Sequence, residues 1–257
     1  DFAEAHLRRR RRDRFAEVKP EVGETGEQRA ATGSGGVAVI GMSGRFPMAE
    51  DAEALWRNLV EERDCITEIP GTRWDWREVH GDPLKEAGKT NIKWGGFIDG
   101  IDEFDPLFFG ISPREAELMD PQQRLMMTHI WKAVEDAGYS AASLAGSRTA
   151  IMVATGNSTY SRLVARAGIG LDGYGTTGLT PSFGPNRMSY FLDWHGPSEP
   201  IETACSSSLV AVHRAMQALA TDSCEMAVAG GVNTMLTPAG HIGFNKAGML
   251  SVDGRCK

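Results

Sequence analysis

The sequence lacks any long uninterrupted run of apolar residues, and only four of its 257 residues are cysteines. Without about 20 consecutive apolar residues it offers no candidate for a membrane-spanning helix, and no segment near its start resembles a signal peptide. The cysteines, Cys65, Cys205, Cys224 and Cys256, show no C-x-x-C spacing, which argues against a zinc site and against a disulfide framework. We therefore expect a reducing cytoplasmic setting, with no membrane partner.

Several motifs of nucleotide-binding and hydrolytic sites are absent as well. The sequence has no G-x-x-x-x-G-K-[ST] phosphate loop, no G-x-S-x-G nucleophile elbow and no C-G-[SA]-C-[WY] signature of papain-type proteases. "VAVIGMSGRF" places Gly41 and Gly44 after an apolar run, but the dinucleotide motif G-x-G-x-x-G is incomplete there. We expect no bound nucleotide cofactor.

Charge is distributed unevenly along the chain. The net charge is -7, yet residues 1–19 carry +3, mainly from the five arginines from Arg8 to Arg12, so the rest carries -10. An acidic body argues against nucleic acid as the main partner. Residues 1–35 are poor in large apolar groups and include "GETGEQRAATGSGG". They are typical of a flexible linker or docking segment that the fold does not need, and residues 36–257 are expected to form the domain.

From Val37 onward, apolar periodicity predicts strands that alternate with helices. The expected strands cover residues 37–40, 148–155, 197–203 and 225–233. The expected helices cover residues 51–64, the stretches on either side of Pro121 up to Gly138, residues 185–196, and Cys205 to about Ala220. Residues 65–110 are expected to be loops with short elements. This alternation indicates the α/β class, with a largely parallel sheet and helices on its faces.

One cysteine stands at a junction of these elements, in "PIETACSSSLVAVH". Cys205 follows an expected strand and opens an expected helix, and a helix N-terminus favours the reactive thiolate. Ser206, Ser207 and Ser208 are small and leave room for a substrate, while the Cys205 N–H can donate to an oxyanion. Free cysteines are also among the most buried residues, so the spacing alone leaves a nucleophile and an inert buried cysteine equally open.

The sequence reveals no base for this cysteine. His213 lies eight residues further along the same helix, about 12 Å of rise away, which is beyond hydrogen-bond reach. We therefore expect His213 to pack or to cap. Sequence reasoning gives no position to His129, His195 or His241.

"ETACSSSLVAVH" resembles the active-site signature of the ketosynthase (beta-ketoacyl synthase) domains of modular polyketide synthases. Four further stretches agree: "VAVIGMSGRFP", "WGGFIDGIDEFDPLFFGISPREAELMDPQQRLMM", "PNRMSYFLDWHGPSEPI" and "AVAGGVN". The resemblance covers residues 37–257, and "KWGGFIDG" and "GPSEPI" are most similar to assembly lines served by free-standing acyltransferases. Glu202 stands where the family usually has Asp, a change that we expect to be tolerated.

The resemblance implies a thiolase-like fold, with this chain as the N-terminal half of a five-layer αβαβα sandwich in an enzyme that dimerises. It implies that Cys205 accepts an acyl chain from one acyl carrier protein as a thioester. That chain is then condensed, with loss of carbon dioxide, with a malonyl-type extender on another carrier. Because substrates arrive on phosphopantetheine arms, the resemblance implies no cofactor and no metal bound by the domain itself.

The two histidine motifs of this family, H-G-T-G-T and K-x-N-x-G-H, do not occur in the sequence, which stops at "MLSVDGRCK". We expect a second half, in another chain or a continuation, to supply the catalytic histidines. A lone first half is expected to expose Leu209, Val212 or Met216 as an apolar patch. Two alternatives stay open: a non-elongating ketosynthase that only transfers acyl chains, and a docking or scaffold fragment without turnover.

Overall fold

The computed structural model describes residues 36–169 and 173–257. The expected linker over residues 1–35, with its arginine run, lies outside these ranges. The described helices are α2 (Ala52–Val60), α3 (Pro113–Leu118), α4 (Pro121–Asp136), α5 (Ala141–Leu144), α6 (Tyr160–Arg166), α7 (Gly173–Leu179), α8 (Phe183–Leu192), α9 (Ser207–Ala220) and α10 (Ala239–Lys246), with 3-10 turns η1 (Trp76–Val79) and η2 (Ala204–Ser206). The described strands are β1 (Thr67–Glu68), β2 (Trp94–Gly95), β3 (Thr149–Thr155), β4 (Ser198–Ile201) and β5 (Met226–Val232).

The larger sheet has the strand order β4-β3-β5, and both pairings are parallel. Ile151 of β3 is paired with Ser198 of β4, and Thr149 with Met226 of β5. Parallel neighbours need crossover connections: α6, α7 and α8 lie between β3 and β4 in the chain, and α9 lies between β4 and β5. The predicted α/β alternation and parallel sheet are confirmed.

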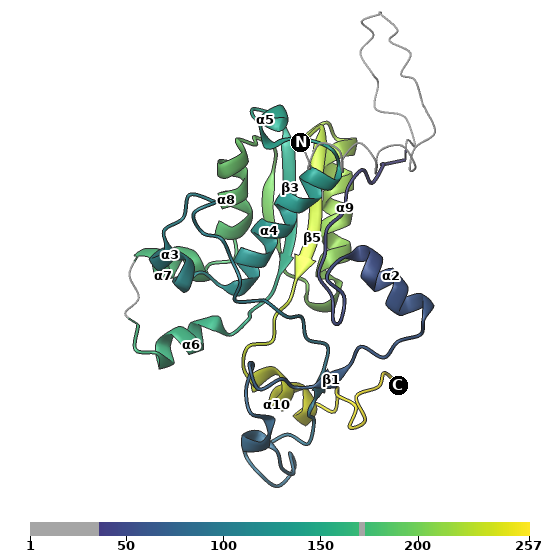
Figure 1. The fold of residues 1–257 in the computed structure, drawn as a ribbon, viewed down its shortest axis with the longest axis vertical. Helices are drawn as coiled ribbons and strands as arrows, with labels where there is room; N and C mark the ends of the chain where they lie inside the picture. Colours follow the sequence, from purple (N-terminus) through teal and green to yellow (C-terminus); the bar gives the residue numbers. More distant parts are fainter. Residues whose placement is uncertain (1–35, 170–172) are drawn as a thin grey trace, which may run out of the picture. The chain divides into compact units, whose positions relative to one another are not determined.

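Two apolar clusters cover the central strand, one from each side. All seven residues of β3 are buried, and successive side chains point to opposite faces of a strand. Ile151 and Val153 belong to the cluster that contains residues of α4 and α8. Ala150 and Met152 belong to the cluster with α9, which runs alongside β5 (Figure 1).

The boundaries of α3 and α4 follow from their capping residues. The side chains of Ser112 and Asp120 accept hydrogen bonds from the backbone N–H groups of Glu115 and Gln122, and a proline occupies the first position of each helix. Such caps satisfy N–H groups that have no partner inside the helix. Gly138 follows α4 with a φ of 81°, a conformation that favours glycine. The predicted start at Pro121 and stop at Gly138 are confirmed.

The predicted buried strand at residues 37–40 is wrong. These residues are irregular, and Val39 is 77% exposed. Among the described residues the segment has no strand partner, and an unpaired apolar run gains neither a ladder nor burial. The next residue, Gly41, lies so close to α4 that a Cβ there would be 2.5 Å from the carbonyl oxygen of Ala133. Close packing on α4 therefore explains this glycine.

Residues 65–110 form loops with short elements, as predicted. β1 and β2 pair in antiparallel fashion, and hydrogen bonds join this region to α10. His241 Nε2 lies 3.0 Å from the carbonyl oxygen of Trp94, and Thr90 Oγ1 donates to Asn245 Oδ1 at 2.9 Å. β1 and α10 lie together beyond the arrowhead of β5 (Figure 1). Both segments are thus at the carboxyl edge of the parallel sheet.

Candidate functional site

Cys205 lies at the same carboxyl edge, between β4 and α9. β4 ends at Ile201, the 3-10 turn η2 contains Cys205, and α9 begins two residues later at Ser207. The thiol-bearing residue is exposed. In open α/β sheets, ligands bind outside the carboxyl ends of the strands. The predicted strand–cysteine–helix arrangement is therefore present, with a single 3-10 turn ahead of the α-helix.

The residue before the cysteine has an unusual backbone conformation. Ala204 has a φ of 55°, in the left-handed region, which costs a residue other than glycine about 1–2 kcal/mol. Its N–H donates to Glu202 Oε1 at 2.7 Å. Sequence reasoning missed this conformation, because alanine carries no side-chain signal for it.

Ser206 and Ser207, which follow the cysteine, also stabilise this turn through hydrogen bonds to its backbone. Ser207 Oγ accepts from the Thr203 N–H at 2.8 Å and donates to the Ala204 carbonyl at 2.7 Å. Ser206 Oγ donates to the Thr203 carbonyl at 2.9 Å. The expectation that these serines only leave room for a substrate was incomplete, since two of them satisfy backbone groups of the turn.

The four cysteines differ in exposure and surroundings. Cys224 is 2% exposed, and burial raises the pKa of its thiol, which disfavours the thiolate. Cys65 is half-buried and Cys256 is exposed. Cys205 combines exposure with a position between a parallel strand and a helix, so it is the strongest candidate for a nucleophile in the described chain.

Three histidines are engaged away from this turn. His129 Nδ1 lies 2.8 Å from Ser43 Oγ, and burial with the nearby Lys132 and Arg45 lowers the pKa of His129 to about 4. His195 Nε2 lies 3.0 Å from an Asp193 oxygen. The buried His241 contacts the backbone of β2, as described above.

His213 was expected to pack or to cap; it is exposed on α9, so within the described residues it does not pack. The helix itself was predicted correctly, but His213 lies on the face of α9 that is exposed to solvent. Among the described residues, none of the hydrogen bonds made by a histidine side chain goes to Cys205.

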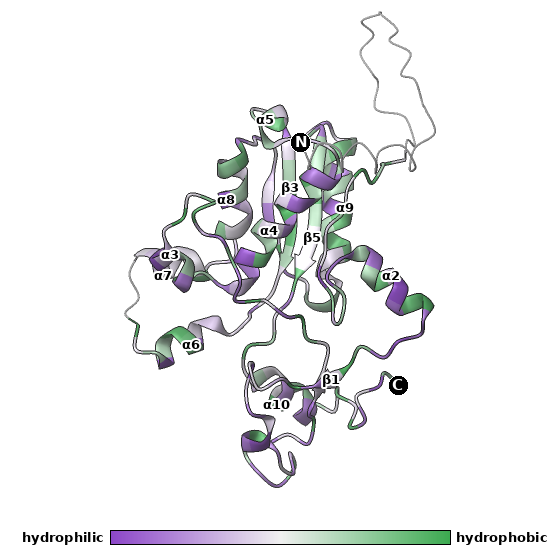
Figure 2. Cartoon of the chain, in the orientation of Figure 1, coloured by the Kyte–Doolittle hydropathy of each residue, from purple (hydrophilic) through white to green (hydrophobic). Residues whose placement is uncertain are grey.

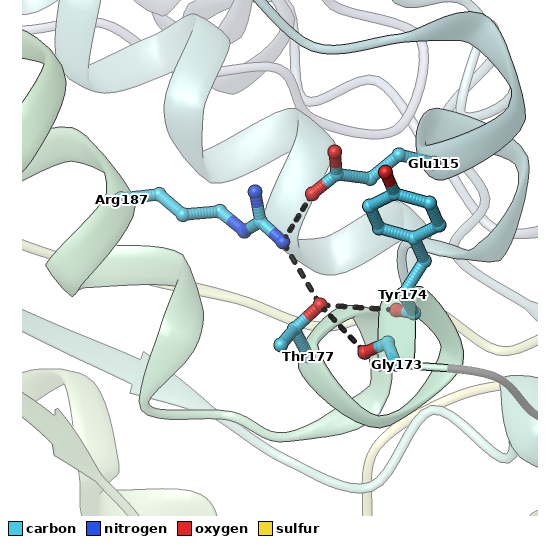
Figure 3. Close-up of a pocket in the computed structure, with 5 residues that line it drawn as sticks. All are labelled: Glu115, Gly173, Tyr174, Thr177 and Arg187. Atoms are coloured by element: carbon cyan, nitrogen blue, oxygen red, sulfur yellow. Dashed lines mark hydrogen bonds and ion pairs between the residues drawn. The ribbon is translucent and has the colours of Figure 1, made fainter.

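Hollows in the described part of the chain also lie away from the cysteine turn. One, of about 360 Å³, is lined by residues of α3, α7 and α8 (Figure 3). There an Arg187 nitrogen lies 2.6 Å from a Glu115 oxygen and also donates to Thr177 Oγ1 at 3.1 Å. The guanidinium and the carboxylate neutralise each other, and the five lining residues include no cysteine or histidine. This hollow offers no thiol and no imidazole.

The second hollow, of about 430 Å³, contains His129 together with charged side chains of both signs and an aromatic wall that includes Phe108 and Trp131. The rings of Phe108 and Trp131 meet edge to face with centroids 4.8 Å apart. In the ranges 36–169 and 173–257, no group of three or more His, Cys, Asp and Glu side chains is placed to hold a metal ion. Nor does any helix of these ranges have the length and apolarity needed to cross a membrane.

Comparison with known proteins identifies the family. Residues 35–257 match the family model "Beta-ketoacyl synthase, N-terminal domain". The polyketide synthases PksN and PksR of Bacillus subtilis are 62% and 47% identical over 86% of this chain, which spans only 4% and 8% of their lengths.

Solved structures agree. The oxazolomycin ketosynthase domain of Streptomyces albus JA3453 has a TM-score of 0.77 at 42% identity, with 85% of this chain and 37% of that chain covered. The ketosynthase from module 6 of the bacillaene synthase of Bacillus subtilis has a TM-score of 0.74 at 40% identity, with 85% and 35% covered. The predicted thiolase-like fold is confirmed. The chain belongs to the beta-ketoacyl synthase family and corresponds to the N-terminal domain of polyketide synthase ketosynthases.

Proposed function

We propose that this chain carries the nucleophile of a polyketide ketosynthase, and that Cys205 is the acyl acceptor. The observation that carries the proposal is the exposed thiol of Cys205 at the carboxyl edge of the parallel sheet, immediately before α9. The thiolate is the reactive form of a cysteine nucleophile.

The proposed reaction has two steps, which divide one difficult condensation. The Cys205 thiolate attacks the carbonyl carbon of an acyl thioester on the phosphopantetheine arm of an acyl carrier protein, and the carrier thiolate leaves. A malonyl-type extender on a second carrier then loses carbon dioxide, and its carbanion attacks the Cys205 thioester. The carbon–carbon bond forms and the Cys205 thiolate is released. The N–H of Cys205 is proposed to donate to the oxyanion in both steps.

The exposed apolar residues on the outer face of α9 favour the packing of a second half of the domain against this helix. Leu209, Val212 and Met216 are 78%, 45% and 47% exposed, and apolar stretches run along α9 (Figure 2). We propose that a second half of the domain, in a continuation or in another chain, covers this face and brings the catalytic histidines to Cys205, and that the complete enzyme is a homodimer. The solved ketosynthases, of which this chain spans about a third, are long enough to contain such a half.

Acyl loading of the full protein tests the role of Cys205. Incubation with an acyl carrier protein that bears an acyl thioester should add one acyl mass to the peptide that contains Cys205, and Cys205→Ala should abolish it. Cys256 is the internal control, because it is also exposed but does not stand between a strand and a helix. Acylation of Cys256, Cys65 or Cys224 in place of Cys205, detected by peptide mass spectrometry, would overturn the assignment.

A further inference from the structure

We propose that Glu202 is a positioning residue for Cys205: its carboxylate holds the left-handed backbone of Ala204 and thereby fixes the direction in which the next residue presents its thiol. The inference rests on the proposed role of Cys205 as the acyl acceptor. It concerns a residue that the sequence offered only as a tolerated change.

The backbone of residues 203 and 204 is held by side chains at each of its four polar groups. Ser206 and Ser207 bond to three of them, the N–H and carbonyl of Thr203 and the carbonyl of Ala204. The fourth, the Ala204 N–H, donates to Glu202 Oε1 at 2.7 Å. This last bond and the bond from Ser207 to the Ala204 carbonyl both end on the residue whose φ is 55°, and the Glu202 bond is the one of the two that a carboxylate makes.

A carboxylate suits this task for two reasons. A hydrogen bond to an ionised acceptor is about twice as strong as a neutral one, and left-handed alanine needs support from its surroundings. The second oxygen of Glu202 also lies against the end of β3, since a Cβ built on Gly156 would be 3.4 Å from Glu202 Oε2. Glu202 therefore lies between the cysteine turn and the residue that follows the central strand of the sheet.

The test measures the second-order rate at which iodoacetamide alkylates Cys205 in the full protein, relative to Cys256 in the same sample. Glu202→Ala should lower this rate about ten-fold, the effect expected for loss of one charge-assisted hydrogen bond. Glu202→Gln keeps an oxygen at the same distance along the side chain but not the charge, and should recover part of the rate. Adding Ala204→Gly to Glu202→Ala should also restore part of it, since glycine adopts positive φ without cost.

A matched control removes another carboxylate from the same segment. Glu199 lies on β4 and pairs with Arg214 of α9 at 3.1 Å, so Glu199→Ala should leave the alkylation rate of Cys205 unchanged. Thermal unfolding of each variant shows whether the fold persists.

The inference is overturned if Glu202→Ala alkylates like the native protein, or if neither Glu202→Gln nor the added glycine recovers the rate. The same variants, given an acyl carrier protein charged with an acyl thioester, separate the two proposals. If Cys205 of the native protein takes no acyl group, the proposed function fails. If it is acylated natively and equally fast in Glu202→Ala, only the role of Glu202 fails.

Discussion

The two sides of the parallel sheet are built on different principles. On the α4 and α8 side, large side chains fill the space against β3, among them Met127, Ile130, Met188 and Trp194, all less than 5% exposed. On the α9 side, the buried residues of the helix are Ser207, Ala211, Ala215 and Ala218. Three larger apolar residues of α9, Leu209, Val212 and Met216, are exposed, whereas Val210 and Leu219 are partly buried against the sheet-side cluster.

On one side, α4 and α8 cover the sheet with buried side chains. On the other side, α9 covers the sheet but leaves large apolar side chains exposed on its own outer face. Small residues let α9 lie close to the sheet, while its outer face keeps large apolar side chains for another surface. A helix that is apolar on both faces is typical of a buried layer. We therefore expect the α4 and α8 side to contribute most to the stability of this chain, and the outer face of α9 to be the surface that the proposed second half covers.

Truncation of buried and exposed methionines should give the largest contrast. Met188→Ala on α8 removes a side chain that is 0% exposed and should lower the free energy of unfolding by about 2–5 kcal/mol. Met216→Ala on the outer face of α9 is the matched control and should change it by no more than about 0.5 kcal/mol. Chemical denaturation measures both. Equal losses would contradict the comparison.

Enlarging a small residue beneath α9 should have the next largest effect. Ala211 is 0% exposed between α9 and the sheet, so Ala211→Leu should push the helix outward and cost about 1–3 kcal/mol of unfolding free energy. Val212→Leu, one residue further on the exposed side, serves as the control and should be neutral. A tolerated leucine at position 211 would show that α9 is loosely packed on the sheet.

The sequence predicted the order of strands and helices around the site, because β3, β5 and α9 carry their signals locally. It also placed Cys205 between a strand and a helix. It could not predict the turn itself. An alanine does not indicate a left-handed backbone conformation, and the hydrogen bond from the Ala204 N–H to Glu202 forms only once the turn has formed. The error at residues 37–40 has a related origin, since an apolar run predicts burial only where a partner strand is present.

A smaller, pH-dependent effect should come from α4. In the folded chain the pKa of His129 is lowered from 6.5 to about 4, so between these values the unfolded chain binds more protons and stability falls as the pH falls. After allowance for solvent around the half-buried ring, the loss is about 1–2 kcal/mol over that range. His129→Asn should flatten this part of the stability profile.

The smallest effect on stability is expected on the outer face of α9 itself. Leu209 is 78% exposed, so Leu209→Ser should leave the free energy of unfolding of residues 1–257 within about 0.5 kcal/mol of the native value. The same substitution should reduce self-association of that chain, measured by sedimentation velocity, because it removes the most exposed large apolar side chain of the α9 patch. Leu84→Ser is the control: Leu84 is 89% exposed but lies outside α9. If the two variants associate to the same extent, the exposed apolar residues of α9 do not drive self-association. In the complete domain, where a second body is proposed to cover α9, Leu209→Ser should instead destabilise the assembly, because the lost side chain would then be a buried one.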